Sequence, residues 1–183
     1  ASHLIVENGY AAFIDTGTTL SVPLLLKVLA EKGISREKVT HVMPTHVHLD
    51  HAGGAGALMQ EFPNAVLVVH PRGARHMIDP TKLISGTVAV YGEEKTQKLY
   101  GTIVPVPEDR VLIAEDESRI DFHGRSLLFL DAPGHARHHY CVIDESTNSV
   151  FSGDNFGISY REFDNENGAF IFPTTTPVQF DPE

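Results

Sequence analysis

The sequence has one cysteine, no long apolar run and few basic residues, and each shortage excludes a class of protein. Cys141 alone cannot form an internal disulfide, which favours a reducing, cytoplasmic location. No apolar run approaches the ~18–20 residues of a membrane-spanning helix, so we expect no membrane partner. The 14 Lys and Arg against 24 Asp and Glu give a formal net charge of -10, which argues against a nucleic-acid partner.

The length and composition are those of one ordinary globular domain. The 183 residues suffice for one well-buried domain and are marginal for two. No internal repeat or low-complexity segment divides the chain, although it begins at Ala1 rather than at a methionine, which leaves room for an upstream segment. We expect a single domain over residues 1–183 that acts on a small-molecule substrate. The oligomeric state stays open, with a homodimer among the options.

Hydrophobic periodicity predicts alternating strands and helices. The expected strands are residues 3–6, 10–14, 39–43, 65–69, 104–106, 110–113, 118–122, 126–130, 140–143 and 149–152. The expected helices are residues 21–32, 52–62, 72–78, 80–84 and 93–100. Asn8-Gly9 and His123-Gly124 are expected hairpin turns, and residues 172–177 an expected loop.

Residues 45–51 concentrate three imidazoles and one carboxylate within six consecutive positions. His46 and His48 alternate at the end of an expected strand, so they project to the same side. Asp50 and His51 follow where the chain turns into an expected helix. Imidazole and carboxylate together suit zinc, iron or manganese. The segment therefore predicts a metal site, and a solvated polar loop is the competing interpretation.

Polar residues recur next to glycine at three other strand ends. Asp15-Thr16-Gly17 closes an early strand, residues 131–135 close a later one, and Ser152-Gly153-Asp154 closes a third. Glycine at these points lets the backbone approach an ion closely. Taken alone, a loop histidine or aspartate carries little information, and Asp15 is equally well interpreted as a turn residue.

In their order along the chain, these motifs resemble a known family. DTG at 15–17, THVHLDH at 45–51, PGH at 133–135 and SGD at 152–154 are similar to the motifs of the metallo-β-lactamase-fold superfamily of metal-dependent hydrolases, in its glyoxalase II-like THxHxDH branch. The resemblance implies an α/β fold, a four-layer αββα sandwich with a binuclear metal centre at one edge between two sheets. It implies two divalent ions, zinc first, with iron or manganese also accepted.

The resemblance also implies a role for each motif residue. The first ion would be held by His46, His48 and His135, and the second by Asp50 and His51. Asp154 would be the carboxylate that bridges both ions. Asp15 would orient the loop that bears the histidines.

Two features depart from the family pattern. Residues 135–139 read His-Ala-Arg-His-His, in which His139 matches the last histidine of the family motif, whereas Arg137 and His138 belong to this sequence. These three and Tyr160 are candidate substrate contacts. The family's later ligand of the second ion is missing, since no histidine follows His139. We expect a fragment of a longer chain that lacks its C-terminal portion; a weakly bound second ion, or a ligand from a partner subunit, are the alternatives.

The remaining histidines and the cysteine have no motif. His41, His70, His76 and His123 are interpreted as strand-end or surface residues rather than as ligands. Cys141 lies in an expected strand and is interpreted as a core residue rather than a nucleophile.

For function, the resemblance implies a hydroxide that bridges the two metals and cleaves an ester, thioester, lactone or related bond in a small molecule. Asp50 would help to orient that hydroxide, which makes it the catalytic candidate. The alternatives are an iron-dependent dioxygenase or oxygen reductase on the same fold, a phosphodiesterase of the nuclease branch, and a non-catalytic metal-binding domain. The motifs do not select the bond, because loops set specificity in such folds.

Overall fold

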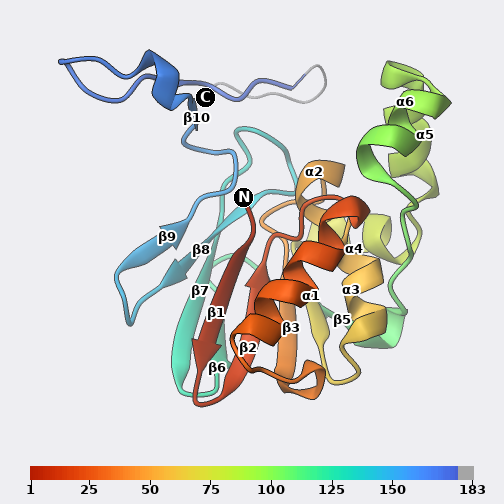
Figure 1. The fold of residues 1–183 in the computed structure, drawn as a ribbon, viewed down its shortest axis with the longest axis vertical. Helices are drawn as coiled ribbons and strands as arrows, with labels where there is room; N and C mark the ends of the chain where they lie inside the picture. The colour runs from red at the N-terminus through yellow and green to blue at the C-terminus, as the bar shows by residue number, and fades with distance from the viewer. Residues whose placement is uncertain (177–183) are drawn as a thin grey trace.

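Two β-sheets face each other across one core, and helices cover the outer face of the first sheet (Figure 1). The computed structural model describes residues 1–176. The first sheet has five strands in the order β1 (His3–Glu7), β2 (Tyr10–Ile14), β3 (Val39–Met43), β4 (Val66–Val69) and β5 (Val111–Ile113). The second sheet has the order β6 (Arg119–Phe122), β7 (Arg125–Asp131), β8 (Tyr140–Asp144) and β9 (Ser149–Phe151).

The first sheet is mostly parallel. β1 and β2 form an antiparallel hairpin whose turn residues, Asn8 and Gly9, have φ values of 48° and 79°, as expected for a type I′ turn. β2 to β5 then run parallel to one another. The connecting helices are α1 (Val22–Glu31), α2 (Leu49–Ala52), α3 (Ala55–Glu61), α4 (Pro71–Ile78), α5 (Thr81–Tyr91) and α6 (Glu93–Tyr100).

Strands β2, β3 and β4 contribute to two separate apolar clusters, because neighbouring side chains point to opposite faces. Phe13 and Val42 pack with the helices, together with residues such as Phe62. Ile14 and Met43, one position further on, pack instead against residues of the second sheet. A sheet that is covered on both faces requires strands with apolar residues at successive positions, because both faces are buried.

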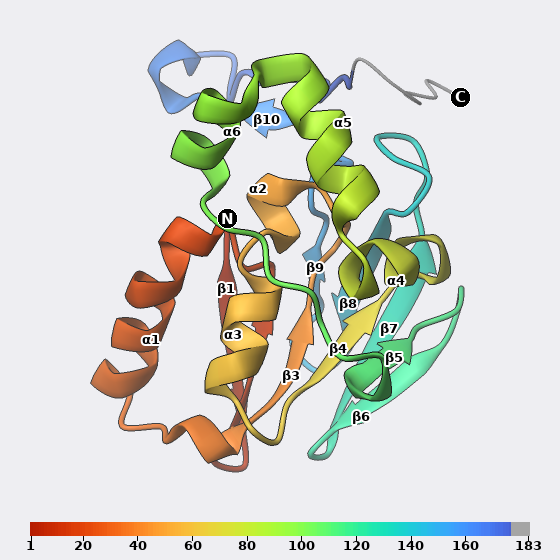
Figure 2. The same ribbon diagram turned by 90° about the vertical axis from the view of Figure 1, so that its right-hand side faces the viewer.

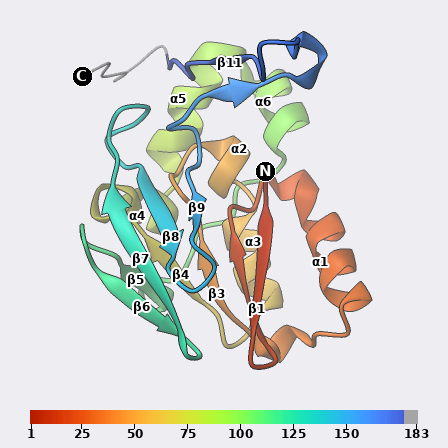
Figure 3. The same cartoon turned by 90° about the vertical axis from the view of Figure 1, so that its left-hand side faces the viewer.

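The second sheet is an antiparallel meander. Its residues Leu127 and Phe129 are buried against the first sheet. Within residues 1–176, α1, α3 and α4 lie on the first sheet, and no helix lies on the outer face of the second (Figures 1 and 3). Three of the four expected layers are therefore present in the described part of the chain.

Two small units rise above one end of the sandwich (Figures 1 and 2). One is the pair α5 and α6, joined at Gly92, which has a φ of 81°. The other is a short hairpin of β10 (Ile158–Ser159) and β11 (Ile171–Phe172). The parallel strands β2 and β3 have their carboxyl ends at this same end of the molecule, and α2 also lies there.

The elements follow the sequence expectations with four differences. Residues 104–106 are not a strand: Val106 donates to the carbonyl of Met77, and the prolines at 105 and 107 cannot donate to a ladder. The helix expected at 52–62 is divided into α2 and α3, and α5 continues to Tyr91. Phe172 belongs to β11 rather than to a loop, and residue 177 lies outside the described residues. No helix in the described part of the chain is long and apolar enough to cross a membrane.

Candidate metal centre

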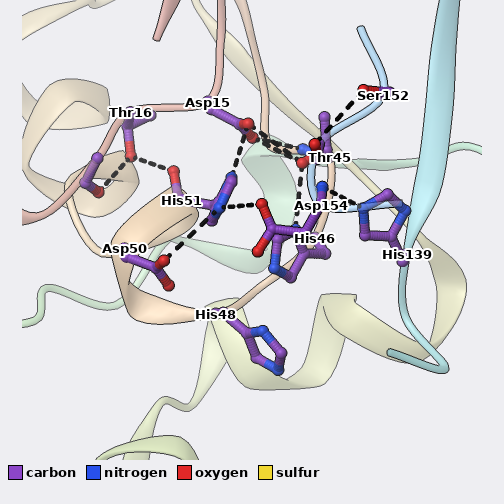
Figure 4. Close-up of polar contacts among 12 residues, drawn as sticks. Asp15, Thr16, Thr45, His46, His48, Asp50, His51, His139, Ser152 and Asp154 are labelled. Carbon is purple, nitrogen blue, oxygen red and sulfur yellow. Dashed lines mark hydrogen bonds and ion pairs between the residues drawn. The ribbon is translucent and has the colours of Figure 1, made fainter. Parts of the chain in front are cut away.

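The carboxyl ends of strands from both sheets converge on one cluster of histidines and aspartates (Figure 4). From the first sheet, the loop after β3 supplies His46 and His48, and α2 supplies Asp50 and His51. Two loops of the second sheet complete the cluster. His135 lies between β7 and β8, and Asp154 follows β9.

His46, His48 and His135 form the first group of candidate ligands, with one ring nitrogen from each within 4.8 Å of the others. The Nε2 atom of His135 lies 3.0 Å from Nδ1 of His48. The two ring nitrogens therefore face each other, as two ligands of one ion would. His135 Nδ1 lies 3.1 Å from the carbonyl of Thr174, and by donating to it leaves Nε2 free to bind the metal.

His46, His51 and Asp154 form the second group, again within 4.8 Å. One carboxylate oxygen of Asp154 lies 3.1 Å from Nε2 of His51, and the other lies 3.5 Å from Nε2 of His135. Asp154 therefore faces a histidine of each group, which is the position expected of a bridging carboxylate. Asp50 lies outside both groups; its carboxylate is 3.6 Å from Nε2 of His51, and its side chain is 62% exposed.

The protonation states of the first group fit a divalent ion. The Nε2 atom of His46 is buried and has no hydrogen-bond partner among residues 1–176. Burial, with further contributions from His51 and His48, holds the pKa of His46 well below its usual value. Burial likewise lowers the pKa of His48 to about 4. Neutral imidazole is the form that binds metal, and an ion would satisfy the buried nitrogen of His46.

Asp15 holds the second group in place. It ends β2 in the left-handed region, at a φ of 55°, and accepts hydrogen bonds from the backbone of Thr45 at 2.7 Å and from Nδ1 of His51 at 2.8 Å. Burial alone would lower the pKa of His51, but the hydrogen bonds to Asp15 and Asp154 outweigh it and raise the pKa to about 10. Without metal, His51 is thus protonated at neutral pH, and an ion at Nε2 would replace that proton.

The four candidate substrate contacts lie in different surroundings. His139 is buried behind the cluster, and its Nε2 atom accepts from the backbone of Asp154 at 3.2 Å. The ring of His138 lies 5.2 Å from that of His48, close to the first group. The side chain of Arg137 is exposed. Tyr160 is 46% exposed and stacks on Phe172 in the β10–β11 hairpin.

Tyr100 is a residue near the centre that the sequence motifs did not indicate. Burial, neighbouring Tyr91 and the negative charge of Asp50 raise the pKa of Tyr100 to about 12. The hydroxyl of Thr19 holds the end of α6 there, since it lies 2.9 Å from the carbonyl of Thr102 and 3.0 Å from that of Gly53, just after α2. Tyr100 stands before a glycine at the end of a helix, and this local sequence does not indicate that the residue lies near the candidate metal centre.

Comparison with known proteins matches residues 1–178 to the metallo-β-lactamase superfamily. The metallo-β-lactamase fold-containing protein of Sulfurisphaera tokodaii is 28% identical over 170 residues, which are 84% of this chain and 59% of that protein. An atrochrysone carboxyl ACP thioesterase of Pseudocercospora fijiensis is 28% identical over 134 residues, 73% of this chain and 29% of that one.

A solved structure has a similar fold over nearly the whole chain. The crystal structure of an archaeal metallo-β-lactamase superfamily protein from Sulfolobus tokodaii is similar with a TM-score of 0.72 and 25% identity, over 97% of this chain and 63% of that chain. This chain thus spans only part of the length of the relatives that it matches. The fold, the family match over nearly the whole chain and the clustered histidines agree. The chain belongs to the metallo-β-lactamase superfamily.

Proposed function

We propose that the protein is a metal-dependent hydrolase of small molecules that binds two divalent ions, with zinc first and iron or manganese as alternatives. The observation that carries the proposal is the pair of ligand groups that share His46 and are joined by the carboxylate of Asp154. When bound, two such ions supply a Lewis acid and an activated water.

The chain's own residues would then hold and orient the reactants. Asp15 fixes His51 through Nδ1, and Thr174 fixes His135 in the same way, so both rings present Nε2 to the centre. Asp50 is exposed beside His51, where its carboxylate can accept a hydrogen bond from water and orient it. The pKa of Tyr100 is raised to about 12, so its phenol stays protonated at neutral pH and keeps a hydrogen to donate.

Within this class we propose the glyoxalase II-like branch, on the THVHLDH motif at 45–51. The motif does not select the bond, and we propose thioesters first among the substrates on the name of a relative. A relative that is 28% identical over 73% of this chain is a thioesterase by name, which supports this order. Esters and lactones follow, because the same attack on a carbonyl carbon applies to them.

The test begins with elemental analysis of the purified protein, followed by a panel of thioester, ester, lactone and phosphodiester substrates. We expect zinc-dependent hydrolysis that a chelator abolishes and that zinc restores. His48→Ala should lose turnover, whereas His123→Asn, at the end of the sandwich away from α2, should keep it. Unchanged turnover of His48→Ala would contradict the proposal. So would stoichiometric iron together with oxygen consumption, which would instead favour the redox alternative.

A further inference from the structure

His70 and Asp131 form a contact between the two sheets, outside both ligand groups, in which the His70 ring is buried and the Asp131 side chain is 33% exposed. His70 directly follows β4 and is 6% exposed, and Asp131 is the last residue of β7. The Nδ1 atom of His70 accepts from the backbone of Arg72 at 3.0 Å, as the cap of α4. Its Nε2 atom therefore carries the hydrogen and donates to the Asp131 carboxylate at 2.8 Å.

Asp131 begins the loop that supplies His135 to the metal centre. The backbone of Asp131 also donates to the carboxylate of Asp116 at 2.8 Å, so both its main chain and its side chain are held. Across the loop, the backbone of Ala132 donates to the carbonyl of His139 at 3.0 Å. The loop is thus closed at its base beside Asp131, and at its other end the backbone of Tyr140 donates to the carbonyl of Thr45 at 3.0 Å.

The first turn of α4 contacts the same loop at a second point, beyond His135. The guanidinium of Arg72 donates to the carbonyl of Arg137 at 3.1 Å. Gly73 lets this turn pass close to both halves of the centre, because a Cβ at that position would lie 2.8 Å from Val47 and 3.8 Å from the Cβ of His138. The segment from His70 to Gly73 therefore lies between the loop that carries His46 and His48 and the loop that carries His135.

We propose that His70 is a positioning residue for the metal centre, which by holding Asp131 sets where His135 stands relative to His46 and His48. The two histidines of the first loop come from the first sheet, and His135 comes from the second. Metal ligands tolerate deviations of only about 0.2 Å from their preferred distances. A small movement of the second sheet's loop would therefore remove His135 from the first group without changing His135 itself.

The test measures zinc binding by calorimetry in the metal-free full chain with His70→Asn. Asparagine is a preferred helix cap, so it can still accept from the backbone of Arg72, but it is too short to reach Asp131. We expect the dissociation constant for zinc to rise roughly tenfold, at the low end of the losses seen when groups behind the ligands are removed. Asp131→Ala should have the same effect, and the double variant no more than either, since both remove one contact.

Two controls separate positioning from a general loss of stability. Asp131→Asn keeps an oxygen that can accept from His70 and should bind zinc close to the wild-type affinity. His123→Asn is the same substitution in the β6–β7 turn, which lies at the end of the sandwich away from α2 (Figure 1), and it breaks a 3.0 Å contact with Thr40. His123 has a φ of 53°, which asparagine also adopts, so the substitution should not disturb the turn. We therefore expect the zinc affinity of His123→Asn to equal that of the wild type.

Cobalt absorption gives a second readout, because loss of one histidine ligand changes the ligand-field bands of bound Co²⁺. We expect altered bands for His70→Asn and unaltered bands for His123→Asn. The proposal is overturned if His70→Asn binds zinc as the wild type does, or if both variants lose affinity equally. Absence of zinc binding by the wild type would overturn it together with the metal centre, whereas normal wild-type binding with an unaffected His70→Asn overturns this inference alone.

Discussion

At the scale of single residues, His46 differs from the other histidines because it belongs to both ligand groups. It is fully buried, and its Nδ1 atom faces the hydroxyl of Thr45 at 3.2 Å. His48 and His135 belong only to the first group, and His51 only to the second. Removing each of these residues should therefore affect metal content differently.

We expect His46→Ala to abolish binding of the first ion, because Nδ1 of His46 faces Thr45 and its one remaining nitrogen, Nε2, can bind only one ion. His48→Ala should weaken the first ion alone, and His51→Ala the second. Elemental analysis after dialysis against limiting zinc would measure the stoichiometry, with His123→Asn as the control for folding. Two ions retained by His46→Ala would contradict the assignment of His46 as a metal ligand.

The sequence indicated the cluster residues far better than the residues that surround them. His46, His48, His51, His135 and Asp154 stand in short motifs whose order is itself informative, and the structure brings their side chains together. His70 and Tyr100 stand in no motif, and their positions depend on contacts with residues far along the chain. Such contacts follow from how the sheets and helices pack, which no local pattern records.

At the scale of elements, the glycines between α2 and α3 allow the chain to pass through a crowded region. A Cβ at Gly53 would lie 2.3 Å from the carbonyl oxygen of Leu49. At Gly56, inside α3, it would lie 1.8 Å from the carbonyl oxygen of Val104. Residues 101–106 therefore cross α3 in direct backbone contact, and they connect α6 to the first sheet.

Gly56→Ala should consequently displace residues 101–106, and with them the end of α6 that carries Tyr100. We expect a loss of about 1–3 kcal/mol in the free energy of unfolding, as for other overpacked sites, measured by urea titration. Gly86→Ala is the matched control, because Gly86 lies in α5 with open space around it. That change should be neutral or stabilise by up to ~1 kcal/mol. Equal effects of the two substitutions would contradict the close contact.

The same segment shows why one strand prediction was wrong. The alternation of valine and proline at 104–107 is typical of extended chain, and the chain there is without helix. An extended segment becomes a strand only if a neighbouring edge accepts its hydrogen bonds, and proline removes two of the donors. The sequence also did not predict the break between α2 and α3. The small residues there are compatible both with a continuous helix and with an interruption of the helix.

At the scale of the whole molecule, one arginine joins the two sheets through its side chain. The guanidinium of Arg125, on β7, contacts Glu7 of β1 at 2.6 Å and Asp144 of β8 at 2.6 Å. Burial alone would raise the pKa of Asp144, but hydrogen bonds from Ser146, Thr147 and Arg125 outweigh it and lower the pKa to about 2.

Because this pKa is lower in the folded protein than the ordinary value of 3.8, Asp144 stabilises the fold above pH 3.8, and this contribution is lost as the pH falls through about 2. The shift corresponds to roughly 2 kcal/mol. Urea unfolding of the wild type and of Asp144→Asn from pH 6 to pH 2 should show a difference that narrows at the acidic end. A difference that does not change with pH would exclude the carboxylate as its source.

The overall sandwich was predictable from the motif order, whereas the number of layers in this chain was not. The motifs at strand ends indicate which strand ends lie close together, because both sheets place candidate ligands at one end of the core. They carry no information on which segment covers the outer face of the second sheet, since that depends on apolar surfaces away from the ligands. Within residues 1–176 the α-helices are α1, α3 and α4 on the first sheet, α2 at the metal centre, and the pair α5 and α6 above it.

The division of the centre between the sheets gives a bound ion a second effect. His48 and His135 are 87 positions apart, and the chain has a single cysteine, so no disulfide can close such a loop. An ion held by both histidines acts as a removable cross-link, which restricts the unfolded chain and is favoured only in the folded one. A chelator would then affect this protein as a reducing agent affects a protein with a disulfide bond. The two sheets would keep their apolar core but lose the cross-link between them at one end.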